Sequence, residues 1–207
     1  MLDVCIKRYP ALAVCREDMQ KAIDCLISCY ENGGKLLICG NGGSCADAEH
    51  IVGELMKGFL KKRPIPADKR QKMIARMPSA ADLLDNLQEG LPAISLTSFA
   101  ALNSAFCNDV EPSMMYAQNV LALAKPGDIL LGLSTSGNSK NVVNAALIAK
   151  SLGITVITMT GESGGKLREI SDICIRVPAV ETYQVQELHL PVYHTLCAAV
   201  EEHFFAN

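Results

Sequence analysis

Residues 35–44, KLLICGNGGS, combine a short apolar run with a glycine-rich loop. An apolar run of this length is typical of a strand that is buried on both faces of a parallel sheet. Residues 128–139, DILLGLSTSGNS, repeat the arrangement with a loop of serine, threonine and glycine. Glycines let the backbone approach a ligand closely, and a following helix points unpaired N–H groups and its positive dipole end at an anion. The two segments together predict an anion-binding site.

Ordinary strand-to-helix turns are the alternative, because they also use glycine, serine and asparagine. One such loop alone would favour an ordinary turn, whereas two loops that each follow a predicted strand favour the anion site. Neither loop matches the nucleotide-binding patterns GxxxxGK[ST] or GxGxxG. The second loop supplies four hydroxyl donors, Ser134, Thr135, Ser136 and Ser139.

Strands and helices alternate along most of the chain. Strands are predicted at residues 35–39, 92–97, 128–133, 154–160 and 173–177, and helices at 10–32, 46–56, 113–124 and 140–152, with a closing helix that ends at Phe205. This alternation is typical of the α/β class, with an open, mostly parallel five-stranded sheet and helices on both faces. Ligands of such sheets bind beyond the carboxyl ends of the strands.

The composition excludes several classes of protein. The chain has 207 residues, of which 49% are hydrophobic, so it suits one domain with a full core rather than a disordered chain. Its formal charge is −3, which does not favour binding to nucleic acid. No apolar run reaches the ~18 residues of a membrane span. Nine scattered cysteines without a CxxC indicate reduced thiols, and we expect a cytoplasmic protein.

Residues 60–91 do not fit the alternation. The first part, LKKRPIPADKRQKMIARMP, is basic and interrupted by prolines, and the second part, SAADLLDNLQEG, is typical of a short helix. The segment is too long for a simple connection between a strand and a helix. It is either a lid over the site or an excursion on the surface, and the sequence leaves both alternatives open.

Histidine and acidic side chains gather in two places. His50 and Glu54 lie four residues apart on a predicted helix, so they share one face. Such a pair alone is more often a surface pair than a site. Further along, four polar side chains fall within nine residues: Gln186, Glu187, His189 and His194. Histidine and glutamate transfer protons and bind zinc, so these clusters are candidates for chemistry. We assign His189 and His203 to structural or surface roles.

Four segments resemble one known family. They are CGNGGSCADAEH (39–50), LLGLSTSGNSKNVVNA (130–145), VITMTGESGGKL (156–167) and IRVPAVETYQVQELHLPVYH (175–194). They closely resemble the phosphoheptose isomerases of the SIS (sugar isomerase) superfamily, from about Gly33 to the C-terminus with an interruption at 60–91. The resemblance implies a single SIS domain over 1–207, a flavodoxin-like three-layer sandwich, with an extra N-terminal helix at 1–32.

The resemblance also implies roles for matching residues. Glu54 falls on the position of the catalytic base and His194 on that of the partner acid/base. Zn²⁺, one ion per subunit, would be bound by His50, Glu54, Gln186 and His194. Substrate contacts fall on Asn41, Gly42, Gly43, Ser44, Asn108, Asp109, Ser134, Thr135, Ser136, Ser139 and Gln186. The family assembles as a homotetramer with its sites at subunit interfaces.

By this resemblance the protein converts sedoheptulose 7-phosphate to D-glycero-D-manno-heptose 7-phosphate, the entry to bacterial heptose synthesis for lipopolysaccharide. Two alternatives stay open. One is an isomerase of another phosphosugar. The other is a non-catalytic SIS protein that senses a phosphosugar or binds a replication initiator. Relatives that serve as adaptors lose the proton-transfer side chains at the positions of Glu54 and His194, and their presence here favours the enzyme.

Three positions depart from the family pattern. Gly58 stands where an arginine is common, and Tyr183 stands where an acidic residue is expected three positions before Gln186. Pro191 lies in a segment that is normally helical throughout. Inside a helix it would cost ~3 kcal/mol unless the fold compensates. Alternatively it marks the first turn of a helix that begins there.

Overall fold

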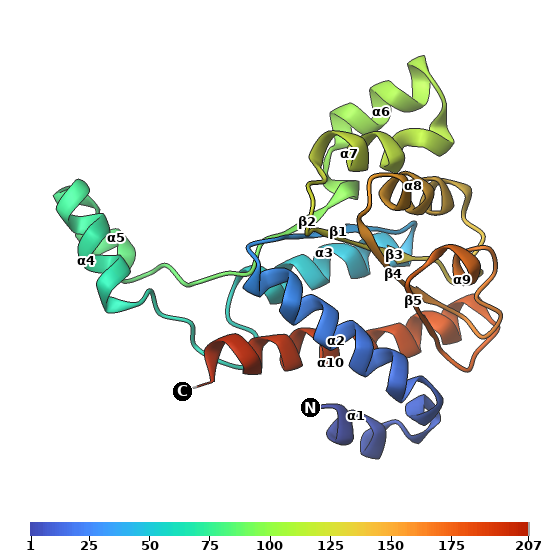
Figure 1. The fold of residues 1–207 in the computed structure, drawn as a ribbon, viewed down its shortest axis with the longest axis horizontal. Coiled ribbons are helices and arrows are strands. Elements are labelled where there is room, and N and C mark those ends of the chain that lie inside the picture. The colour runs from blue at the N-terminus through green and yellow to red at the C-terminus, as the bar shows by residue number, and fades with distance from the viewer. Residues whose placement is uncertain (207) are drawn as a thin grey trace.

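A computed structural model describes residues 1–206 and has three layers, a parallel sheet between two layers of helices (Figure 1). The strands of the described chain are β1 (Leu36–Cys39), β2 (Ala93–Ser95), β3 (Ile129–Leu133), β4 (Thr155–Thr160) and β5 (Ile173–Arg176). They form one sheet in the order β2-β1-β3-β4-β5, and every pairing is parallel. The predicted fold class is confirmed.

The apolar strands are explained by burial on both faces. Side chains alternate between the two faces of a strand. In β1, Leu36 and Ile38 enter one core, and Leu37 and Cys39 enter the other. All four residues are buried, so an uninterrupted apolar run is what this position requires.

Helices cover both faces (Figure 1). One core is covered by α1 (Leu2–Arg8), α2 (Arg16–Glu31), α3 (Gly43–Met56) and α10 (Thr182–Phe205). The other is covered by α7 (Met115–Leu123), α8 (Lys140–Ser151) and α9 (Leu167–Ile170), with α6 (Ala100–Asp109) packed on α7. Short 3₁₀ turns lie at Pro10–Cys15, Pro78–Ala80, Leu96–Ser98 and Pro112–Met114. None of the helices between residues 1 and 206 is long and apolar enough to cross a membrane.

The prediction of one helix over residues 10–32 was wrong at its start. α1 precedes this segment, and α2 begins only at Arg16, after the 3₁₀ turn Pro10–Cys15. Tyr9 separates α1 from the turn with a φ of −127°, because a residue before proline avoids the helical conformation. α3 also begins earlier than predicted, at Gly43 inside the glycine-rich loop.

Pro191 lies inside α10, which runs without a break from Thr182 to Phe205. The alternative in which a helix begins at Pro191 is therefore wrong. Proline has no N–H, so the helix loses one hydrogen bond here. Burial of apolar side chains on both sides of Pro191, among them Val185 and Val192, holds the helix together. Thr195 Oγ1 also donates to the carbonyl of Pro191 at 2.7 Å.

Residues 60–91 form an arm that projects from the domain (Figure 1). It contains α4 (Ala67–Arg76) and α5 (Ala81–Leu84), and no residue of α4 is buried. The two ends of the arm meet in a stem, where Pro64 pairs with Gln88 and the N–H of Glu89 donates to Arg63 O at 2.7 Å. In the single chain the arm is thus an outward excursion.

The strand order determines where a ligand can bind. From β1 the chain continues to β2 on one side, whereas β3 lies on the other side of β1. The loops that follow β1 and β3 therefore run in opposite directions at the carboxyl edge of the sheet. Ligands of open α/β sheets bind at this kind of switch point. The two loops that the sequence singled out, residues 40–44 and 134–139, flank it.

The stability of the fold should depend on the protonation of His189. This side chain is fully buried in α10, and neither ring nitrogen has a hydrogen-bond partner among residues 1–206. Burial lowers the pKa of His189 from 6.5 to about 4. Because the unfolded chain binds the proton more readily, stability is complete above pH 6.5 and falls as the pH drops toward 4. The loss is on the order of 3 kcal/mol.

The comparison of wild type with His189→Leu by thermal unfolding from pH 4 to 7 tests this. We expect the melting temperature of the variant to fall less steeply between pH 6.5 and 4. His203→Leu is the control, because His203 is exposed beside Glu31. Equal slopes for wild type and His189→Leu would contradict the assignment.

Candidate active site

A cavity of about 270 Å³ lies at the switch point, between the loops after β1 and β3. Most of the predicted substrate contacts line it. The lining residues are Asn41, Gly42, Gly43, Ser44, Leu133, Ser134, Thr135, Ser139, Thr182 and Gln186. The structure therefore gathers side chains from both loops and from the start of α10 into one polar cavity. No residue of the arm belongs to this lining.

The first loop packs closely against α10. A side chain at Gly43 would place its Cβ 2.7 Å from Nε2 of Gln186, so only glycine fits there without a shift. α3 begins at Gly43, and the first N–H groups of a helix have no partner within it. The N–H groups of Ser44 and Cys45 donate to the carbonyls of Asn41 and Gly42 at 3.0 Å, so the loop forms a tight turn beside the cavity.

Two side chains that the sequence analysis did not select hold the first loop in place. Asn141, at the start of α8, exchanges two amide hydrogen bonds of 2.9 Å with Asn41. The hydroxyl of Tyr116 donates to Gly40 O at 2.7 Å. Neither residue lies near Asn41 in the sequence, so only the folded chain reveals these contacts. Asn141 thus fixes the first loop against α8, and Tyr116 fixes it against α7.

The second loop presents hydroxyl groups at the start of α8. Ser134 is buried, and its Oγ donates to Ser139 Oγ at 2.9 Å. Gly137 has a φ of +68°, and its own Cβ would lie 2.0 Å from Gly164 O, so the turn requires glycine. Ser139 is the residue before α8, whose first N–H groups point toward the loop. Hydroxyls and helix-start amides of this kind suit a phosphate group.

Three residues predicted to contact the substrate lie away from this cavity in the single chain. Ser136 lines a neighbouring cavity of about 240 Å³, and its Oγ accepts the N–H of Asn138 at 3.1 Å. Asn108 and Asp109 are exposed at the end of α6 and are hydrogen-bonded to each other at 2.9 Å. None of the three lines the cavity at the switch point.

His50, Glu54 and His194 come together, as the family resemblance implied. Nε2 of His50 lies 3.0 Å from Oε1 of Glu54 and 3.5 Å from Nε2 of His194. The four-residue spacing on α3 and the contact of α3 with α10 produce this meeting. Their ligating atoms all lie within 4.8 Å of one another. Two imidazoles and one carboxylate are the donor set of many catalytic zinc sites, so the three residues fit a zinc ion.

Tyr193 and Asp47 orient His50, and the sequence analysis did not select either. The Tyr193 hydroxyl lies 3.2 Å from Asp47 Oδ1 and 3.0 Å from His50 Nδ1. When the phenol donates to Asp47, its oxygen accepts the Nδ1–H of His50, which leaves the Nε2 lone pair toward Glu54 and His194. A hydrogen bond to the ring nitrogen that faces away from a metal fixes the tautomer of a metal-binding histidine.

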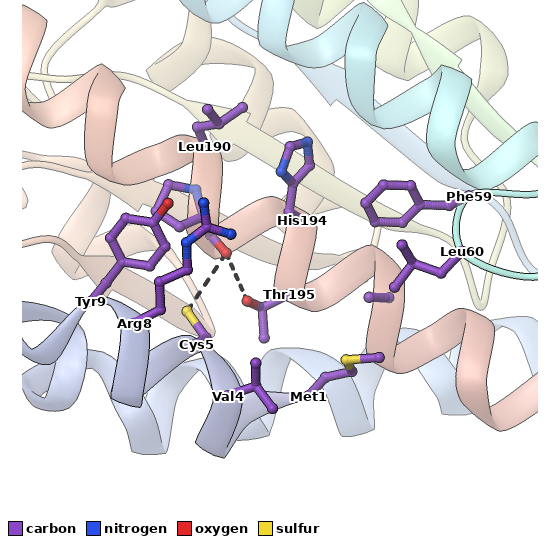
Figure 2. Close-up of a pocket in the computed structure, with 12 residues that line it drawn as sticks. Met1, Val4, Cys5, Arg8, Tyr9, Phe59, Leu60, Leu190, His194 and Thr195 are labelled. Carbon is purple, nitrogen blue, oxygen red and sulfur yellow. Dashed lines mark hydrogen bonds between the residues drawn. The ribbon is translucent and has the colours of Figure 1, made fainter.

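The surroundings of His194 favour its neutral form. Burial lowers its pKa, and the neighbouring His50 lowers it further. The ring of Phe59 lies beside it, with centroids 5.4 Å apart (Figure 2). A neutral imidazole can bind a metal or accept a proton.

Gln186 lies two helical turns before His194, about 12 Å along the axis of α10. Its amide packs against Gly43 and lines the cavity at the switch point. The structure thus places Gln186 among the residues predicted to contact the substrate. Its role as a zinc ligand stays a prediction.

A larger, mostly apolar cavity of about 420 Å³ lies on the other side of His194, between α1, α10 and Phe59–Leu60 (Figure 2). Cys5 and Thr195 both donate to the carbonyl of Pro191 at its floor. Arg8 brings a charged side chain to its lining. The hydroxyls and helix starts that suit a phosphate lie at the switch point instead.

Known proteins share this sequence and this fold. The SIS domain family matches residues 11–83 and 70–161. A phosphoheptose isomerase of Aneurinibacillus thermoaerophilus is 37% identical over 181 residues, which cover 87% of this chain and 79% of the relative. The chain belongs to the phosphoheptose isomerase family of SIS domain proteins. This family consists of phosphosugar isomerases, and the chain is an enzyme of that class. The two matched stretches overlap at residues 70–83, inside the arm.

Solved phosphoheptose isomerases have the same fold. The structure from Francisella tularensis matches with a TM-score of 0.78 and 31% identity, and the one from Neisseria gonorrhoeae with a TM-score of 0.76 and 30% identity. In each comparison, 97% of this chain and 94% of the other chain are covered. The phosphoheptose isomerase fold therefore spans nearly the whole chain.

Replacement of Tyr193 by phenylalanine tests the orientation of His50. We expect Tyr193→Phe to weaken Zn²⁺ binding by about 10- to 100-fold, because the ring of His50 loses its hydrogen-bond partner. Competition with a chromophoric chelator measures the affinity. Tyr183→Phe is the matched control, since Tyr183 lies on the same helix and is 60% exposed. Unchanged affinity in Tyr193→Phe would contradict the role of its hydroxyl.

Proposed function

We propose that the protein converts sedoheptulose 7-phosphate to D-glycero-D-manno-heptose 7-phosphate, the entry to heptose synthesis for bacterial lipopolysaccharide. One observation carries the proposal. His50, Glu54 and His194 converge within 4.8 Å, and the helix of His50 and Glu54 begins at a cavity lined by hydroxyls and helix starts. A phosphosugar isomerase needs both features, one to hold the phosphate and one to move protons.

The reaction moves one proton between carbons and one between oxygens. Glu54 removes the proton from C1 of the ketose and returns it to C2, through an enediol. His194 carries the proton from O1 to O2 as the carbonyl moves from C2 to C1. The lowered pKa of His194 keeps its imidazole neutral, so it can accept a proton and release it again. Together these transfers give the aldose without any net gain or loss of protons.

The phosphate binds in the second loop. Ser134, Thr135 and Ser139 donate hydroxyl hydrogen bonds, and the start of α8 supplies backbone donors and its positive dipole end. Binding energy from this group holds the reacting carbons in place, away from the phosphate itself. Asn41, Ser44 and Gln186 then contact the sugar hydroxyls from the other side of the cavity.

His50, Glu54 and His194 would hold the zinc ion, with Gln186 as the fourth ligand. A zinc ion held there would supply a positive charge to stabilise negative charge on an oxygen of the enediolate. Tyr193 keeps the Nε2 lone pair of His50 directed toward that position.

The proposal includes a cytoplasmic homotetramer. No residue of α6 (Ala100–Asp109) is buried in the single chain, which supports its packing against another subunit. Asn108 and Asp109 lie at the end of this helix, so they would contact the substrate of a neighbouring subunit. This accounts for predicted substrate contacts that do not line the cavity of their own chain.

Turnover of sedoheptulose 7-phosphate, with and without added Zn²⁺, tests the function. We expect NMR to show the aldose phosphate with wild-type protein, and kcat to fall about 10²- to 10⁴-fold in Glu54→Gln and His194→Gln. His203→Gln is the control, because this histidine is exposed far along α10. Absence of turnover by wild type in both conditions would contradict the function, and unchanged kcat in both variants would contradict the residue roles.

A second candidate is an isomerase of another phosphosugar. Tyr183 and Gly58 favour it, because they replace an acidic residue and an arginine of the family pattern. Tyr183 directly follows Thr182 and lies three residues before Gln186, and both of these neighbours line the cavity. A panel of five- to seven-carbon ketose phosphates, assayed in the same way, decides between the two by their kcat/KM.

A further inference from the structure

Arg63, in the stem of the arm, is completely buried although it carries a charge. Its side chain is 0% exposed, and Nε donates to Glu201 Oε1 at 2.9 Å. The other two nitrogens donate to backbone carbonyls, Nη1 to Leu55 at 2.6 Å and Nη2 to Glu54 at 3.0 Å. Phe205 covers the guanidinium group, whose carbon lies 4.6 Å from the ring centre. Every nitrogen of the side chain is thus used.

Glu201 is equally buried and is held by three groups. Its two oxygens accept the N–H groups of Phe59 at 2.8 Å and Leu60 at 2.7 Å, besides Arg63. Burial alone would raise the pKa of Glu201, but these two N–H groups and Arg63 outweigh burial and lower it. The carboxylate therefore stays charged, and the pair remains an ion pair.

The pair connects the two helices that carry the reacting groups. Arg63 satisfies carbonyls in the last turn of α3, including the carbonyl of Glu54 itself, and puts a positive charge at the negative end of that helix. Glu201 lies seven residues, two turns, after His194 on α10, so it shares a face with it. One buried contact thus links Glu54 to the helix of His194.

Stability alone does not explain this arrangement. Burying two charges costs solvation energy, and well-packed apolar residues of similar volume often give equal or greater stability. Besides any stability, the ion pair of Arg63 and Glu201 supplies a fixed geometry between the segments that it joins. The planar guanidinium holds its three acceptors in one fixed geometry, whereas the three donors of an ammonium group rotate and fix no plane.

We propose that Arg63 and Glu201 are positioning residues that set the distance between Glu54 on α3 and His194 on α10. The inference rests on the proposed function in that Glu54 and His194 are its reacting groups. The arm thereby contributes to the site through its stem, without reaching into the cavity.

Arg63→Lys and the double variant Arg63→Met/Glu201→Leu test the pair. The first keeps the charge and loses the fork, and the second replaces both charges by apolar side chains. We expect both to unfold cooperatively on heating, with kcat lowered at least about tenfold and KM within about twofold of wild type. We also expect the affinity for Zn²⁺ alone to fall about tenfold, because His50 and Glu54 move relative to His194. Lys61→Met is the control, since Lys61 pairs with Glu202 beside this site at the surface.

Measurements of kcat and of Zn²⁺ affinity distinguish a failure of the positioning role from a failure of the proposed function. Folded variants whose kcat and Zn²⁺ affinity both stay within about twofold of wild type would overturn the positioning role and leave the pair as a stabilising contact. If wild-type protein does not turn over sedoheptulose 7-phosphate, the proposed function fails, and Zn²⁺ affinity still decides the inference. A tenfold loss in the variants then supports the pair, and unchanged affinity overturns it.

Discussion

The reversal of chain direction at β1 is the constraint on which the site depends. Because β2 and β3 pair with opposite edges of β1, the loops after β1 and β3 separate and leave a cavity at the carboxyl edge of the sheet. Each loop leads directly into a helix, so two helix starts border the same space. α3 then carries His50 and Glu54 from this cavity to α10 and His194.

A protein with a net charge of −3 has no positive field with which to hold a phosphate. Backbone donors and serine hydroxyls replace that field, and they demand accurate placement of two loops. Gly43 and Gly137 permit the close contacts, and the amide pair of Asn41 and Asn141 joins the two sides. The mostly apolar cavity of about 420 Å³ on the other side of His194 is bordered by no such pair of loops.

Local patterns were sufficient to predict the strands, both loops and the shared helix face of His50 and Glu54, whereas the meeting of these two residues with His194 was implied only by the family resemblance. Strands buried on both faces have a clear apolar signal, and the i, i+4 spacing on α3 is visible in the sequence. α4 and α6 were missed because neither contains a buried residue, so no apolar stripe marks them. Contacts between distant segments, such as those of Tyr193 with Asp47 and of Arg63 with Glu201, have no local signal. The side of the loop that Ser136 faces was likewise not predictable from a run of hydroxyl residues.

Hydrogen exchange at carbon tests the central claim most directly. Wild-type protein is incubated with sedoheptulose 7-phosphate in D₂O, and proton NMR follows loss of the C1 signal and labelling at C2 of the aldose. Because the carboxyl group of Glu54 exchanges its proton with solvent, the account predicts deuterium at C2 of the product. It also predicts that Glu54→Gln abolishes C1 exchange, while phosphate binding by Ser134 and Ser139 persists. C1 exchange at the wild-type rate in Glu54→Gln would contradict the account.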